Sequence, residues 1–270
     1  MDLSDSIIHP IDAVYMAHQS IPVIQVPITN CRGFQIVGFN FSYNHPFVNT
    51  LIALKNGKCS GYQGSPLQKY HQLFQPADAF DVLGLSEKFG SDRLRSLTPL
   101  EAVLPWWPDI GHLMPENRPR AILSTAKKEI RSANLPPSIQ PAMYWYGPFS
   151  NLQGEAEIKR LFDLYHKIDK HGFQRNNNKD GDICGAALVR PDGSFRILLN
   201  GGEHRAAITT ALGYAQIPVR LYSPVSRNII LRADVEKWPQ VRSGLFSVSQ
   251  ALMVFDRIFE GRPSSDGFKF

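Results

Sequence analysis

Hydrophobic and polar positions follow two different periods along this chain of 270 residues. Apolar and polar residues alternate over residues 21–41, with prolines and a glycine between the runs, which predicts two or three strands. From residue 154 to residue 168 the apolar residues recur at helical spacing, and Gly172 is a typical helix stop. Further strands are predicted over 183–189 and 195–199, joined by a hairpin. The pattern therefore predicts an α/β (α+β) fold.

Capping signals predict further helices in both halves of the chain. Ser65, followed by proline, is a typical N-cap, and its helix should extend to Phe74 before a second short helix ends near Gly84. The run Ser247-Val248-Ser249-Gln250 is a capping-box pattern that opens a helix with an apolar face. A glycine and a proline then stop this helix.

Prolines dominate residues 99–141. Because proline fixes φ and removes a hydrogen-bond donor, we expect a connecting, lid-like segment with only a short helix around residues 125–132. Trp106 and Trp107 in this segment can stack on a sugar or a base. The alternative, that they anchor an irregular loop in the core, is the favoured interpretation.

The strongest chemical signal lies in residues 195–207, which read as a strand, a glycine turn and the first turn of a helix. The turn contains Gly201 and Gly202, and the helix opens with Glu203, His204 and Arg205. A helix N-terminus presents N–H groups and partial positive charge to anions, and glycines let the backbone approach a phosphate group closely. The pattern predicts an anion-binding turn. The alternative is an ordinary strand-to-helix turn whose arginine pairs with a local carboxylate.

The run Gly202-Glu203-His204-Arg205-Ala206-Ala207, with Leu212-Gly213 and Ile217-Pro218-Val219 after it, resembles the phosphate-binding motif of the ParB/sulfiredoxin superfamily. The resemblance covers residues 144–221. It implies a compact mixed-sheet core and a nucleotide-binding domain over residues 143–270 that ends in a C-terminal helical extension. Residues 1–142 are then expected to form an accessory region that shapes an acceptor pocket.

Departures from the family pattern narrow the expected activity. Sulfiredoxin needs a cysteine where this chain has Glu203, and the partition proteins continue into a helix-turn-helix region that the residues after Leu221 do not provide. The small-molecule kinase branch keeps an acid before His-Arg. The resemblance therefore implies an ATP-dependent phosphotransferase, using ATP or another nucleoside triphosphate with Mg²⁺, that phosphorylates a hydroxyl group of a small polar metabolite or saccharide.

The resemblance assigns roles to the residues of the turn. Gly201, Gly202, Glu203, His204 and Arg205 are expected to bind the nucleotide, with His204 donating to a phosphate oxygen. Glu203 is expected to be the general base or a Mg²⁺ ligand, because a carboxylate beside phosphate groups is otherwise repelled. The alternatives are that Glu203 only complements the helix dipole and that His204 is a core or capping residue.

An acidic and amide-rich loop precedes the strand at residue 183. Asp182 is a candidate catalytic residue and metal ligand there, since the loop can lie beside the phosphate turn. Arg175 is a candidate nucleotide-binding residue from the same loop. Loops rich in asparagine, aspartate and glycine are also ordinary turns, and that alternative stays open.

Charge and cysteine content limit the classes of partner. The formal net charge is +5, but lysines and arginines are scattered along the chain, which favours small anionic ligands and argues against a nucleic-acid partner. The three cysteines lack metal-ligand or disulfide spacing, so free thiols are expected. No signal peptide or membrane-spanning run is evident, so a cytoplasmic location is expected. The sequence identifies neither the acceptor nor the oligomeric state.

Two rival functions remain from other classes. One is a nucleotide-gated binding module, in which CTP or ATP controls binding of DNA or of a protein partner. The lack of a second helix-turn-helix unit counts against it. The other is a nuclease, which would need more metal-binding carboxylates than the turn region offers.

Overall fold

The computed structural model describes residues 1–42, 44–86, 90, 92–175 and 182–264. The described strands form one mixed sheet of eight strands in the order β1-β2-β7-β5-β6-β3-β4, with β8 also paired to β5. The strands are β1 (Asp2–Leu3), β2 (Val23–Pro27), β3 (Cys31–Gly33), β4 (Phe39–Asn40), β5 (Ile183–Val189), β6 (Phe195–Gly201), β7 (Gln216–Leu221) and β8 (Ile229–Leu231). The predicted α/β class and mixed sheet are confirmed.

Strands from both halves of the chain alternate in this sheet. β5 is antiparallel to β6 and parallel to β7 and β8. β2 pairs antiparallel with β7, and β3 pairs parallel with β6. The predicted division at residues 142 and 143 therefore does not separate two sheets, because strands of the first half flank the strands of the second half on both sides.

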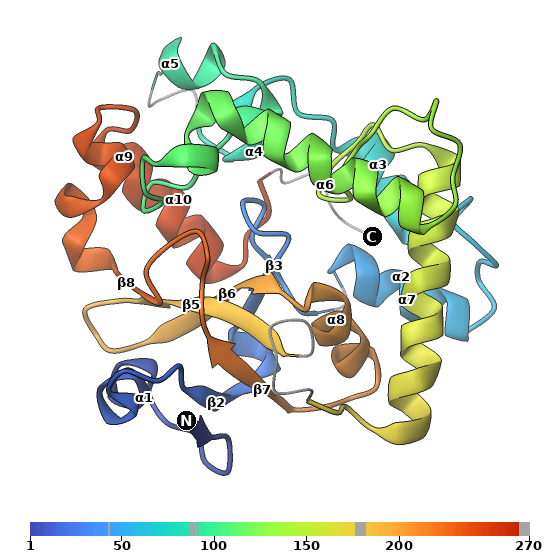
Figure 1. Cartoon of the computed structure of the whole chain (residues 1–270), viewed down its shortest axis with the longest axis horizontal. Helices are drawn as coiled ribbons and strands as arrows, with labels where there is room; N and C mark the ends of the chain where they lie inside the picture. The colour runs from blue at the N-terminus through green and yellow to red at the C-terminus, as the bar shows by residue number, and fades with distance from the viewer. Residues whose placement is uncertain (43, 87–89, 91, 176–181, 265–270) are drawn as a thin grey trace.

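Helices surround the sheet. In Figure 1 the sheet crosses the lower half of the molecule, α7 stands along one side, and α3, α4 and α6 lie above it. The helices are α1 (Pro10–Ala17), α2 (Pro46–Lys55), α3 (Pro66–Leu73), α4 (Ala79–Val82), α5 (Asp92–Arg95), α6 (Arg118–Ser132), α7 (Asn151–His171), α8 (Glu203–Ala211), α9 (Pro239–Arg242) and α10 (Val248–Glu260). None of the helices in the described part of the chain is long and apolar enough to cross a membrane.

Both faces of the sheet are buried. All seven residues of β5 are buried, which is typical of a central strand covered on both sides. On one face, Ala187 and Val189 pack in a core with α2, α7 and α8. On the other face, Ala186 and Leu188 pack in a core with α4 and α10. The cysteines are free thiols, as expected.

The helices with clear capping signals form where the sequence predicts them. Ser65 accepts a hydrogen bond from the backbone N–H of Gln68 and begins α3. Ser247 and Gln250 form the capping box of α10. α7 begins after the N-cap Ser150, a few residues earlier than the apolar spacing indicates. These local signals are sufficient because a cap and an apolar face act within a few turns of one helix.

The proline-rich segment contains a longer helix than predicted. α6 has 15 residues, beginning at Arg118 rather than near residue 125. Pro119 lies in the first turn, where the missing N–H costs no intrahelical hydrogen bond. Trp106 and Trp107 are 3% and 2% exposed and belong to the core with α4 and α10, so the anchor interpretation is confirmed.

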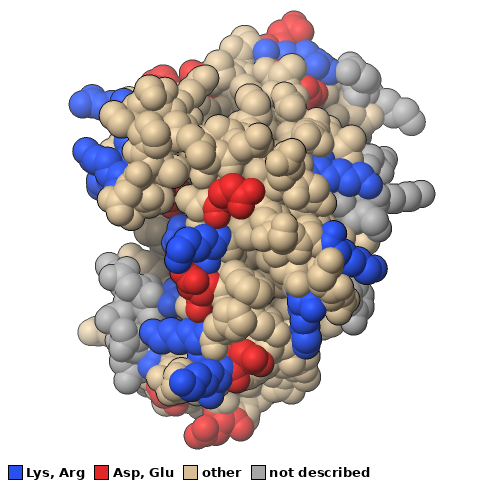
Figure 2. Space-filling model, turned by 90° about the vertical axis from the view of Figure 1, so that its right-hand side faces the viewer, with Lys and Arg blue, Asp and Glu red and all other residues tan. Residues whose placement is uncertain are grey.

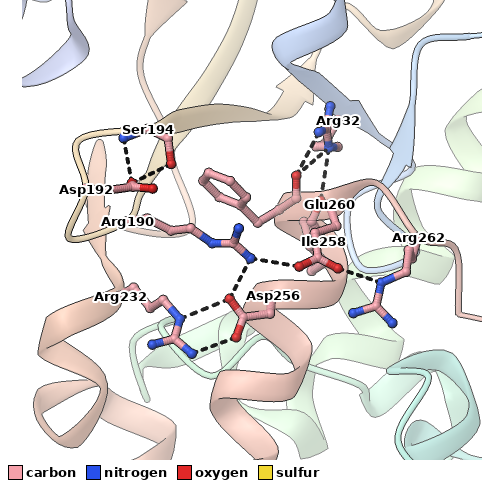
Figure 3. Close-up of polar contacts among 10 residues, drawn as sticks. Arg32, Arg190, Asp192, Ser194, Arg232, Asp256, Ile258, Glu260 and Arg262 are labelled. Atoms are coloured by element: carbon pink, nitrogen blue, oxygen red, sulfur yellow. Dashed lines mark hydrogen bonds and ion pairs between the residues drawn. The ribbon is translucent and has the colours of Figure 1, made fainter.

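Ion pairs fasten α10 to the sheet (Figure 3). Asp256 accepts hydrogen bonds from Arg232 Nε over 2.9 Å and from Arg190 Nη2 over 2.9 Å. At the end of α10, Arg32 Nε donates to the carbonyl oxygen of Ile258 over 3.1 Å. A guanidinium at a helix C-terminus satisfies carbonyl groups that have no intrahelical donor and complements the helix dipole. β3 is thereby tied to α10 as well as to β6.

Candidate functional site

The turn between β6 and α8 depends on one of its two glycines. Gly202 is the N-cap of α8 and has a φ of +81°, which favours glycine. A Cβ atom on Gly202 would lie 2.9 Å from the Cα atom of Ile183 on β5. A Cβ atom on Gly201 would meet nothing closer than the Cβ atom of Cys184, at 3.7 Å. The backbone therefore demands glycine at position 202, at the start of the helix.

Asp182 lies just before β5 and holds two arginines. Arg175 Nε donates to Asp182 Oδ1 over 3.1 Å, and Arg220 Nε donates to Asp182 Oδ2 over 2.7 Å. Asp182 is only 2% exposed. Burial acts to raise its pKa, but the hydrogen bonds from Arg175 and Arg220 bring the pKa below its usual value. A buried, ionised carboxylate thus fixes both guanidinium groups in place.

Cys184 lies close to the glycine turn and to two of the arginines. It pairs with Gly201 on one side and with Arg220 on the other. Burial raises the pKa of Cys184, and the charges of Arg220 and Arg205 oppose this effect. Gly201 and the charge of Arg205 thus lie close to Cys184, whereas Arg175 is linked to this region through Asp182, two residues before Cys184.

The side chain of Glu203 lies inside the protein, with 5% of the residue exposed. The Tyr144 hydroxyl donates to Glu203 Oε2 over 2.8 Å, and the backbone N–H of Gln35 donates to Oε1 over 3.3 Å. Burial raises the pKa of Glu203, and the hydrogen bond from Tyr144 reduces this rise. A carboxylate whose pKa is shifted toward neutrality is suited to accept a proton, as a general base must.

The loop that contacts Glu203 has an uncommon backbone conformation. Phe34 and Gln35 have φ values of +54° and +38°, although neither residue is glycine. Residues in such conformations are concentrated at binding and catalytic sites, where surrounding contacts hold them. Here the side chain of Phe34 is fully buried, so its packing compensates for the strain.

His204 is committed to another part of the fold. Its Nε2 atom lies 2.5 Å from Glu157 Oε1 on α7, and its ring stacks on Phe47 of α2 at 4.7 Å. Although burial acts to raise the pKa of Glu157, the charge of His204 brings it below the usual value. The prediction that His204 donates to a phosphate oxygen does not fit this arrangement, because the side chain points between α7 and α2. His204 positions α8 against these helices.

The described carboxylates do not fit the predicted Mg²⁺ site. Both oxygens of Asp182 accept hydrogen bonds from arginines, and both oxygens of Glu203 accept hydrogen bonds from Tyr144 and Gln35. Within the described ranges, no group of three or more histidine, cysteine, aspartate and glutamate residues could hold a metal ion. The assignment of Glu203 and Asp182 as metal ligands is therefore not supported, and Asp182 acts instead as the partner of Arg175 and Arg220.

Residues that the sequence analysis missed complete the site. Arg220 could have been found, since it is a polar residue between the buried Val219 and Leu221 of a predicted strand. Tyr144, Gln35 and Glu157 gave no such signal, because each reaches α8 from a distant part of the chain. Their contacts depend on the tertiary fold, which local spacing does not reveal.

Charged residues of both signs are mixed on one face of the molecule. Figure 2 shows the side of the molecule on which α7 lies, and positive and negative residues are intermixed there without a broad basic stripe. On α7, Lys159 pairs with Asp163 over 2.5 Å, and Arg160 lies 3.7 Å from Glu129 of α6. On this face the arginines and lysines are scattered among acids, in contrast to the basic stripe of a typical nucleic-acid-binding surface.

Comparisons with protein-family models, with curated proteins and with solved structures found no match. The function is therefore inferred from the chemistry of the site. The two features that carry chemical information are the glycine turn with its arginines and the buried carboxylate of Glu203.

Proposed function

We propose that the protein binds a nucleoside triphosphate at the start of α8 and transfers its terminal phosphoryl group to a hydroxyl group of a small polar metabolite or saccharide. The observation that carries this proposal is Gly202, whose left-handed conformation opens α8 near the charges of Arg205 and Arg220, with Arg175 joined to Arg220 through Asp182. A glycine turn at a helix N-terminus suits a phosphate group, and guanidinium groups neutralise its charge. The resemblance of residues 202–207 to the ParB/sulfiredoxin motif supports the same ligand.

Glu203 is the proposed general base. In the proposed step, the acceptor oxygen attacks the terminal phosphorus, its proton passes to the Glu203 carboxylate, and a nucleoside diphosphate leaves. The raised pKa of Glu203, caused by burial, supports this role. Phosphoryl transfer depends mainly on positioning and on stabilisation of charge, so the arginines supply the second requirement. Since the described carboxylates do not fit a Mg²⁺ site, no step is assigned to a protein-bound metal.

A small cavity begins at Asn200, the residue before the glycine turn. Its volume is about 10 Å³, so we place only the reacting hydroxyl group of the acceptor there. Its polar lining residues are Asn200, Ser223, Ser226 and Gln35, whose backbone also contacts Glu203, and its other lining residues are apolar. Hydroxyl and amide groups at this position can hydrogen-bond a polar acceptor. A cytoplasmic location is part of the proposal, and the free thiols are consistent with a reducing compartment.

The test is a transfer assay on the purified full chain. We expect phosphate transfer from a nucleoside triphosphate, with Mg²⁺ present, to one member of a pool of hydroxylated metabolites, detected as a mass shift. Glu203→Gln should lower the rate by about 10²–10⁴-fold, the range for loss of a general base, while nucleotide binding is retained. Arg220→Met should weaken nucleotide binding instead.

Matched control variants distinguish these effects from a general loss of folding or stability. Glu236→Gln changes an exposed acid and Arg131→Met changes an exposed arginine, and neither should alter transfer or binding. Transfer that persists in Glu203→Gln would contradict the proposed base. Nucleotide binding without any transfer, accompanied by dimer formation, would support the rival nucleotide-gated module and overturn the kinase proposal.

A further inference from the structure

A small cavity lies between α4, α6 and the loop after β3, on the other side of that loop from Glu203. Its volume is about 10 Å³, which is room for roughly one water-sized group at its inner end. Most of its wall is apolar, and Arg118 is its one charged lining residue; the wall is formed by Phe34, Gln35, Ile36, Val37, Val82, Pro99, Arg118, Trp145 and Tyr146. Gln35, Trp145 and Tyr146 are only partly buried, so the cavity has a mouth toward solvent.

Arg118 is a buried cation with no counter-ion among the described residues. The residue is 6% exposed, and its buried Nε atom has no hydrogen-bond partner in the described part of the chain. Its contact is with the ring of Trp107, whose centroid lies 4.5 Å from Arg118 Cζ. Burial lowers the pKa of Arg118 to about 10, which leaves the group charged at neutral pH. A buried charge that lacks a partner is costly, so an anion at this position would be strongly favoured.

The position of Arg118 on α6 adds to this cost. Arg118 is the first residue of the helix, and the N-cap Asn117 provides no side-chain hydrogen bond to the first turn. The positive end of the helix dipole disfavours a cation at this place and favours an anion. The dipole at the start of α6 therefore does not offset the charge of the Arg118 guanidinium.

Trp145 supplies a second donor without an acceptor. Its indole N–H is buried and has no hydrogen-bond partner in the described structure. The backbone of Trp145 is held in place because the hydroxyl group of Tyr70 donates to its carbonyl oxygen. Arg118 and Trp145 both line the cavity, and the Nε of Arg118 and the indole N–H of Trp145 have no acceptor among the described residues. A water molecule can accept these hydrogen bonds but does not balance the charge.

We propose that this cavity binds the carboxylate group of a small organic acid, with Arg118 as its counter-ion and Trp145 as a second donor. A carboxylate is planar and presents two oxygens that match the donor geometry of a guanidinium. A phosphate monoester brings three terminal oxygens, for which the described lining offers too few donors. Because the inner end has room for only about one water-sized group, the remainder of the acid would lie toward the mouth of the cavity. The cavity shares Gln35 with the surroundings of Glu203, but neither Arg118 nor Trp145 has a role in the proposed phosphoryl transfer, so the proposal does not depend on phosphotransferase activity.

The experiment titrates the full chain with acetate, propionate and benzoate in chloride-free buffer at constant ionic strength. Tryptophan fluorescence and the midpoint of thermal unfolding are measured. We expect a saturable rise of the midpoint with at least one of these acids. Arg118→Met should weaken binding by about tenfold to hundredfold, the range for loss of a charge-assisted hydrogen bond. Arg120→Met, which changes an exposed arginine on the same helix, should leave binding unchanged.

A second variant keeps the proposal falsifiable if Arg118→Met does not fold. Trp145→Phe retains the ring and removes the donor, and we expect a several-fold weaker affinity for the acid. Binding that is unchanged in both variants would overturn the proposal. Chloride or inorganic phosphate that saturates the site at lower concentration than every carboxylate would also overturn it, because the ligand class would then be different.

Discussion

At the scale of single residues, the buried charges of this protein fall into two groups. Some are paired, as Asp182 is with Arg175 and Arg220. Others, such as Glu203 and Arg118, have contacts that only partly offset the cost of burying their charge. Paired charges hold a structure in place, whereas incompletely compensated charges create a demand for a ligand or for a proton. The proposed general base, Glu203, and the proposed carboxylate site at Arg118 belong to the second group, whereas the arginines proposed to bind phosphate include the paired Arg175 and Arg220.

The raised pKa of Glu203 predicts how stability changes with pH. A carboxylate with a folded-state pKa above its unfolded value contributes stability below the unfolded pKa and loses it as pH rises through the folded pKa. The variant Glu203→Gln cannot ionise at this position, so its stability does not fall in this way as pH rises. The free energy of unfolding of the variant, relative to wild type, should therefore increase from pH 4 to pH 8, by about 1.4 kcal/mol for each unit of raised pKa. Urea unfolding followed by circular dichroism measures the difference, and a difference that is constant with pH would contradict the buried acid.

Glu157 is predicted to behave in the opposite way. Its pKa is lowered in the folded state, so its contribution is present above the ordinary pKa of a glutamate and is lost as pH falls through the folded pKa. Glu157→Gln leaves His204 without its partner and should cost about 3 kcal/mol at neutral pH, with a smaller cost below pH 4. Asp163→Asn, which removes an exposed ion pair on the same helix, should cost about 0.5 kcal/mol or less. Equal effects in the two variants would show that the buried pair has no special importance.

At the scale of elements, the start of α8 offers a comparison between adjacent glycines. Gly202→Ala forces a Cβ atom to 2.9 Å from Ile183 in a left-handed conformation, so we expect a loss of about 1–3 kcal/mol and a lower affinity for nucleotide. Gly201→Ala has room for its methyl group and should cost less than about 1 kcal/mol. Thermal unfolding and nucleotide titration of both variants provide the test. A Gly201 variant that is more damaging than the Gly202 variant would contradict the described turn.

Elements with local signals were predictable from the sequence, and elements defined by contacts were not. The capping box at Ser247 and the glycine turn at residue 202 act within a few residues of chain, so the sequence predicts α10 and the start of α8. α2 was missed, although its N-cap His45 accepts a hydrogen bond from the backbone N–H of Phe47. Histidine is not among the preferred capping residues, so Pro46 at the first helical position was the one local signal of this helix.

The sequence predicts the glycine turn of the candidate site but not the buried surroundings of Glu203. Gly202 and Arg205 stand together in the sequence, and their chemistry can be recognised there. The direction of the Glu203 side chain depends on Tyr144 and Gln35, which the fold brings from other segments. Arg118 gave no signal either, because its importance comes from burial and from the absence of a carboxylate partner among the described residues. Burial of a charge is a tertiary property, whereas periodicity describes only one element.

At the scale of the whole molecule, the interleaved sheet predicts that the two halves of the chain depend on each other. Residues 143–270 contain β5, β6 and β7, but β2 covers the edge of β7 and β3 covers the edge of β6. We expect a fragment of residues 143–270 to remain unfolded or to aggregate, since both strand edges and one face of α8 would be exposed. A two-dimensional amide NMR spectrum of the fragment checks this. Well-dispersed signals from the fragment alone would contradict the expectation.

The pairing of β2 with β7 also has a consequence for biosynthesis. Pro27 and Gln216 are partners in the sheet although about 190 residues separate them. At roughly 5–20 residues per second, a ribosome needs about ten to forty seconds between these two strands. During that interval the nascent N-terminal segment carries apolar strands with no neighbour to cover them, which is a state that molecular chaperones bind.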